Sequence, residues 1–165
     1  MKKYIIYSFM VCTALCCTLS AQAALLEIEW IDTKKYRDIR ASNENQKYFE
    51  ERVINNLTRF FRTAAEEHLP ADQTLYVRIT DLDLAGDVDY FFARFGQPVR
   101  VVREIFFPSI EFSYIMRDAR DQVIKSGEEN IRDMGFLFYG ARFKKNPPFD
   151  FEKKMIEDWF KNTFK

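Results

Sequence analysis

The chain has 165 residues, with 25 Lys or Arg, 25 Asp or Glu and one His, so its formal net charge is zero. This length suits one domain, which at this size buries about two-thirds of its unfolded surface. The balanced charge gives no basic excess that would suggest nucleic acid or an anionic membrane as a partner, so we expect no nucleic-acid partner.

Residues 1–23 have the features of an export signal. Lys2 and Lys3 form a basic start, residues 4–19 form an apolar run, and Ala21-Gln22-Ala23 is a small-x-small cleavage pattern. The apolar run is shorter than the roughly 20 residues that a spanning helix needs. We therefore expect a signal peptide cleaved after Ala23, no transmembrane segment afterwards, and a periplasmic location, with secretion as the alternative.

Cleavage would also remove every cysteine of the chain, namely Cys12, Cys16 and Cys17. These cysteines do not fit lipidation, since Thr13-Ala14-Leu15 precedes Cys16 where a lipobox would be needed. The remaining domain, residues 24–165, then has no disulfide and no thiol ligand. Such an exported domain must be stabilised by its core alone.

The first predicted elements of this domain are a strand and a long helix. Residues 24–31, ALLEIEWI, are typical of a strand. Apolar residues then recur at helical spacing from about residue 44 to 68. Asn43, with Gln46 three residues later, resembles a capping box, and Pro70 prevents the helix from continuing much further.

The middle of the chain predicts three or four strands. Alternation of apolar and polar residues predicts strands over 75–80, 99–107, 109–116 and 122–131, the last two joined by a tight turn at 118–121. The region 133–148 predicts irregular structure or one short strand. Asp150 can cap a final helix with a continuous apolar face.

This order of elements predicts an α+β fold. We expect a two-layer sandwich with a four- to five-stranded, mostly antiparallel sheet. The long N-terminal helix and the C-terminal helix would both cover one face of that sheet.

Five stretches along the domain resemble one bacterial family. They are WIDTKKYRDIR, TDLDLAG, PSIEFSY, SGEENIRDM and FEKKMIEDWF, and in this order the chain resembles the domain of unknown function 3016 family. The resemblance implies a small exported protein of Gram-negative bacteria. It supplies no activity, substrate, cofactor or catalytic residue.

The most concentrated polar motif is the aspartate cluster Asp81, Asp83, Asp87 and Asp89. As a calcium loop beginning at Asp81, it would have Phe92 at position 12, where a bidentate Glu is needed. An EF-hand is therefore not expected. A looser calcium-binding or small-ligand module that uses the four aspartates stays open as the alternative function.

The aspartates also have a structural interpretation, which we favour. Either the strand ends near Thr80, so that the aspartates bond to turn N–H groups, or a bulge turns Leu82 and Leu84 inward. In both cases the carboxylates would be structural. We expect salt bridges to one or more of four arginines: Arg37, Arg40, Arg132 and Arg142.

Motifs for catalysis are lacking in the sequence. His68 is the single histidine, so a transition-metal site is not expected. No G-x-S-x-G surrounds a serine, and Gly127 lacks the other residues of a phosphate-binding loop. We predict no catalytic residues, no metal and no cofactor, and we lean against an enzyme. A hydrolase without a recognisable motif is the less favoured alternative.

Aromatic residues crowd the stretch that follows the aspartates: Tyr90, Phe91, Phe92 and Phe95. They can form a lid over the open face of the sheet, or an exposed patch for a partner protein or a membrane surface. The sequence therefore predicts a non-enzymatic binding or scaffolding protein of the bacterial cell envelope. Its contact surface would combine these aromatics with the four aspartates, and its expected partner is an envelope protein.

Overall fold

The structure is a computed structural model that describes residues 25–91, 96–140 and 149–164. Its elements, in chain order, are β1 (Leu25–Trp30), the 3-10 helix η1 (Thr33–Lys35), α1 (Gln46–His68), β2 (Thr74–Asp83), β3 (Asp87–Asp89), β4 (Val99–Val101), β5 (Ser109–Arg117), β6 (Val123–Arg132), α2 (Leu137–Gly140) and α3 (Asp150–Thr163).

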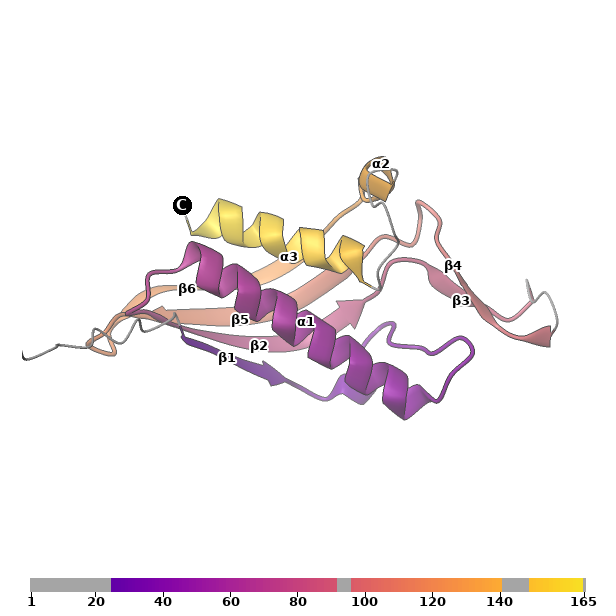
Figure 1. The fold of residues 1–165 in the computed structure, drawn as a ribbon, viewed down its shortest axis with the longest axis horizontal. Coiled ribbons are helices and arrows are strands. Elements are labelled where there is room, and N and C mark those ends of the chain that lie inside the picture. The colour runs from indigo at the N-terminus through magenta and orange to yellow at the C-terminus, as the bar shows by residue number, and fades with distance from the viewer. Residues whose placement is uncertain (1–24, 92–95, 141–148, 165) are drawn as a thin grey trace, which may run out of the picture.

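Four strands form the main sheet, in the order β1-β2-β5-β6. β1 runs parallel to β2, whereas β2, β5 and β6 pair antiparallel. Figure 1 shows α1 and α3 side by side on one face of this sheet. The predicted α+β two-layer sandwich is confirmed, and its sheet is mixed because of the parallel β1.

The long helix forms because its apolar residues repeat every four positions. Phe49, Val53, Leu57 and Phe61 lie on one side of α1, and all four are buried. They face the buried side of the sheet, where β2 contributes alternate residues. Burying such a stripe stabilises the helix more than its intrinsic propensity does.

An aromatic cluster joins the two helices to the sheet. The ring of Phe61 lies 5.8 Å from that of Phe112 in β5 and 6.3 Å from that of Trp159 in α3. Phe112 and Trp159 are 4.8 Å apart, and all three pairs are edge-to-face, the arrangement that aromatic quadrupoles favour. α1, β5 and α3 therefore share one core.

The helix caps differ from the predicted ones by one or two residues. Asn45, not Asn43, caps α1, because its side chain accepts hydrogen bonds from the N–H groups of Lys47 and Tyr48. In α3 the capping position is Phe149, with φ of 70° and no side-chain cap. Asp150 is instead in the first turn, where its negative charge suits the helix dipole.

The strand predicted over 99–107 is shorter and lies outside the main sheet. Only Val99–Val101 form β4, which pairs with β3 in a separate two-stranded sheet. Figure 1 shows this β3–β4 hairpin projecting beyond one end of the main sheet. Alternation in a sequence reveals a strand but not its partner, so the hairpin was not predicted.

Candidate functional site

The aspartate cluster begins at a bulge in β2. Before the bulge Ile79 faces the core, and the register with β5 shifts between Ile79 and Asp81. The shift turns Leu82 and Leu84 inward, where both are buried. This is the second of the two structural arrangements predicted from the sequence. Asp81 and Asp83 therefore lie on the side of the strand that is not buried against the helices.

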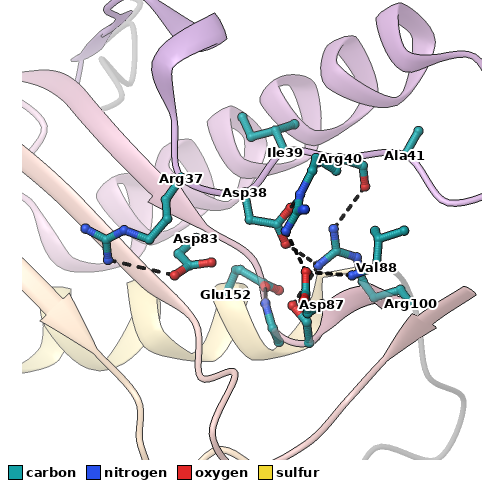
Figure 2. Close-up of polar contacts among 12 residues, drawn as sticks. Arg37, Asp38, Ile39, Arg40, Ala41, Asp83, Asp87, Val88, Arg100 and Glu152 are labelled. Atoms are coloured by element: carbon teal, nitrogen blue, oxygen red, sulfur yellow. Dashed lines mark hydrogen bonds and ion pairs between the residues drawn. The ribbon is translucent and has the colours of Figure 1, made fainter. Parts of the chain in front are cut away.

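Arg37 holds the first two aspartates. Its backbone N–H donates to Asp81 Oδ1 over 2.8 Å, and its Nη2 lies 3.2 Å from Asp81 Oδ2. Its Nη1 lies 3.8 Å from Asp83 Oδ2, as Figure 2 shows. Burial raises the pKa of Asp83, and the charge of Asp38 acts in the same direction, whereas Arg37 lowers it.

A second group, the Asp38 network, consists of Asp38, Arg40, Asp87 and Arg100 (Figure 2). Asp38 is 3% exposed. Its Oδ2 accepts from Arg100 Nη1 over 2.6 Å, and its Oδ1 accepts from Arg40 Nε over 3.0 Å. Arg40 Nη2 also donates to Asp87 Oδ1 over 2.5 Å. The network therefore ties the segment after η1 to both strands of the hairpin.

Arg100 is the centre of this attachment. Besides Asp38, it donates from Nη1 to the carbonyl of Gly86 over 2.9 Å and from Nη2 to the carbonyl of Arg40 over 3.0 Å. Both terminal nitrogens thus have protein acceptors. The Arg100 side chain is 20% exposed, and its bonds to Asp38 and to the Gly86 carbonyl lie partly out of water, where hydrogen bonds from a charged group are stronger.

Glu152 joins α3 to the same region. Its side chain is 2% exposed, and Oε1 accepts from the N–H of Ala85, between β2 and β3, over 2.8 Å. Burial raises the pKa of this carboxyl, while the Ala85 N–H and the charge of Arg100 oppose that rise. The neutral carboxyl is therefore favoured in the folded protein more than in the unfolded chain.

The last two aspartates lead to the end of the hairpin. Asp89 Oδ1 accepts from the N–H of Phe91 over 2.8 Å, and Oδ2 lies 3.8 Å from Arg103 Nη2. Tyr90 is 58% exposed and Phe91 is 99% exposed. Phe92 and Phe95 lie outside the described residues, so the structure places two of the four predicted aromatics.

The four aspartates hold segments of the chain together through arginine side chains. Each of the four aspartates has an arginine within 4 Å. Within the described part of the chain, no group of three or more His, Cys, Asp or Glu side chains is arranged to hold a metal ion. An open hollow of about 240 Å³ beside the Asp38 network is lined by Asp38, Arg40, Asp87, Ile105 and Phe106, among others.

Sequence reasoning found part of this site. Of the four arginines proposed as partners, Arg37 and Arg40 pair with aspartates, Arg132 hydrogen-bonds Asn130, and Arg142 lies outside the described residues. Asp38, Arg100 and Glu152 were missed. No local signal marks the pair of Asp38 and Arg100 or the contact of Glu152 with Ala85, because these partners are 62 and 67 positions apart. His68 lies in the last turn of α1, stacked on Phe160.

The fold and the site together define a small α+β protein with an anchored, projecting hairpin. The model of the family described as "Protein of unknown function (DUF3016)" matches residues 24–162, so the chain belongs to this family. No curated protein and no solved structure matches it. In residues 25–91, 96–140 and 149–164, no helix has both the length and the apolarity needed to cross a membrane.

Proposed function

We propose that this protein is a periplasmic, non-enzymatic binding protein of the bacterial cell envelope, which contacts an envelope component through the end of the β3–β4 hairpin. The observation that carries the proposal is the exposure of Phe91, 99%, at the end of that hairpin. Leaving a Phe ring in water forgoes about 2 kcal/mol of burial. Aromatic side chains are over-represented among the residues that contribute most of the binding energy at protein interfaces.

The anchoring of the hairpin supports a binding role. The base of the hairpin is held by Arg100 and Asp87, which pair with Asp38 and Arg40. A segment that is already held in place loses less conformational entropy when it binds. Each of the four aspartates is paired with an arginine, which favours a contact surface over a ligand site made of their carboxylates.

The periplasmic location is supported by the sequence of residues 1–23, which has the basic start, apolar run and small-x-small end of an export signal. The location can be tested by fractionating cells that produce the full chain and by measuring the mass of the mature protein. Cleavage after Ala23 and release with the periplasmic fraction are expected. A full-length protein in the cytoplasm would contradict this part of the proposal.

The contact can be tested with a photoreactive amino acid at position 91 in the living cell. We expect a crosslinked product after illumination. The matched control carries the same amino acid at Tyr48, which is 69% exposed on the first turn of α1. Equal crosslinking at both positions, or none at position 91, would overturn the proposed contact surface.

A further inference from the structure

Glu152 is a buried acid at the base of the hairpin, with no basic side chain in contact with it. It is 2% exposed, and in the part of the chain that the structure describes no Lys, Arg or His nitrogen lies within 4 Å of its carboxyl. Its hydrogen-bond donors are the N–H of Ala85 and its own N–H. Because neither donor carries a net charge, this environment favours the carboxyl that keeps its proton.

The residue that Glu152 holds belongs to the joint from which the hairpin projects (Figure 1). Ala85 and Gly86 connect the end of β2 to the start of β3. Gly86 N–H donates to Phe106 O over 2.9 Å, and Gly86 O accepts from Arg100 Nη1 over 2.9 Å. A change at Glu152 therefore acts where the direction of the hairpin is set.

Arg100 binds one carboxylate and lines the same hollow as another. Its Nη1 donates to Asp38, while Glu152 and Arg100 both line an open hollow of about 210 Å³. The charge of Arg100 favours the ionised form of Glu152, although the two groups do not form an ion pair in this structure. The hollow leaves room for the guanidinium to swing from Asp38 towards Glu152.

The other charged groups around Glu152 come from the elements that pack near it. Arg52 of α1 and Asp150 of α3 line the same hollow, and Asp83 of β2 lies within the electrostatic reach of Arg100. Arg52 is paired with Glu44. The formal charges of the Asp38 network, two aspartates and two arginines, sum to zero. An ionised Glu152 would therefore add a negative charge without a counter-charge, and a shift of Arg100 supplies one.

We infer that Arg100 exchanges between two carboxylates, and that the proton on Glu152 decides which of them it holds. With Glu152 neutral, Arg100 holds Asp38 and fixes the hairpin base to the segment after η1. Once Glu152 releases its proton to solvent, its carboxylate draws Arg100 out of the Asp38 network, and the hairpin moves towards α3. This inference rests on the proposed function, since it describes how the same contact surface is regulated.

The test is the distance between the hairpin end and α1, measured by electron paramagnetic resonance between nitroxide labels at Phe91→Cys and Tyr48→Cys. The chain from Ala24 onward has no cysteine of its own, so the labels attach at these two positions alone. We expect one distance at about pH 4 and a loss of its population to a second distance as the pH rises to about 8. Glu152→Gln should keep the acid distance throughout this range.

Two matched controls remove other acids from the same region. Asp150→Asn changes the neighbouring acid in the first turn of α3, and Asp83→Asn changes an acid whose pKa burial also raises. Both variants should keep the pH response of the wild-type protein. Loss of the response in either control, as in Glu152→Gln, would assign the switch to the wrong group and overturn the inference.

A second measurement is the titration of the Glu152 carboxyl carbon by nuclear magnetic resonance in the unsubstituted mature chain. Its midpoint should coincide with that of the distance change. A wild-type distance that is independent of pH, a response that persists in Glu152→Gln, or midpoints more than about one pH unit apart would also overturn the inference. A crosslink at position 91 with a fixed distance removes the switch alone. A pH-dependent distance without any crosslink supports the switch and removes the proposed function.

Discussion

Two carboxylates, Asp38 and Glu152, are almost completely buried, and the protein stabilises them in different ways. Asp38 stays between two guanidinium groups, those of Arg40 and Arg100. Glu152 has the backbone N–H of Ala85 as its hydrogen-bond donor. A buried charge needs a partner, whereas a buried neutral acid needs only a hydrogen bond. The two residues should therefore respond differently to loss of charge.

Asp38→Asn should destabilise the protein strongly. The substitution leaves Arg100 largely buried without its carboxylate, so we expect the free energy of unfolding to fall by about 3 kcal/mol. Glu29→Gln is the control, because it breaks the pair with Arg78, in which both side chains are over 60% exposed. That pair should contribute no more than about 1 kcal/mol. Urea denaturation at neutral pH measures both losses. Equal losses would show that the Asp38 network stabilises the protein no more than an exposed ion pair does.

Glu152→Gln should stabilise the protein relative to wild type as the pH rises. Burial holds the pKa of Glu152 above that of the unfolded chain, so its contribution to stability is complete below the unfolded value, about 4.3. That contribution is lost as the pH rises through the folded value, where the buried carboxyl ionises. The substituted side-chain amide keeps an oxygen acceptor for the Ala85 N–H and does not titrate. Melting temperatures between pH 4 and about 8 should therefore diverge in favour of the variant, and parallel curves would contradict this.

At the scale of elements, the β3–β4 hairpin is the feature that the sequence does not predict. The bulge in β2 was one of two arrangements predicted, because aspartates on the face of Val77 and Ile79 would otherwise be buried; the other was an end of the strand near Thr80. The partner of β4 was not, because nothing local distinguishes Val99–Val101 from a strand of the main sheet. The orientation of the hairpin depends on Gly86, at which the chain turns with φ of +83°.

Gly86→Ala should disturb the hairpin more than Gly96→Ala does. Both glycines have positive φ, so either substitution costs about 1 kcal/mol of backbone strain. At Gly86 a Cβ atom would also lie 2.8 Å from the backbone oxygen of Val101, whereas at Gly96 it would meet nothing within 4 Å. We expect the melting temperature to fall at least twice as far for Gly86→Ala. Thermal unfolding followed by circular dichroism measures the difference. Equal shifts would show that the close approach of position 86 to β4 does not affect stability.

At the scale of the whole molecule, the sandwich follows from patterns that are visible in the sequence, whereas the site does not. The four-residue spacing from Phe49 to Phe61 specifies the buried face of α1 wherever that helix packs. Arg100 and Asp38 are 62 positions apart, and their pairing depends on how the hairpin folds back over the segment after η1. Patterns in the sequence specify which face of an element is buried, but they do not specify which distant segments will pair.

The main sheet contains neither β3 nor β4, so the sandwich should fold without the hairpin. Asp87 and Val101 are direct partners across the hairpin. Replacing residues 88–100 with Asn-Gly therefore joins Asp87 to Val101 through a two-residue turn. We expect one cooperative unfolding transition and unchanged helix content by circular dichroism. Arg100 is lost in this shortened protein, so Asp38 is already without its main partner there. Asp38→Asn should then cost less than about 1 kcal/mol, against about 3 in the intact chain. The same large cost in both backgrounds would show that Asp38 stabilises the sandwich itself, and an unfolded shortened protein would show that the hairpin belongs to the folding core.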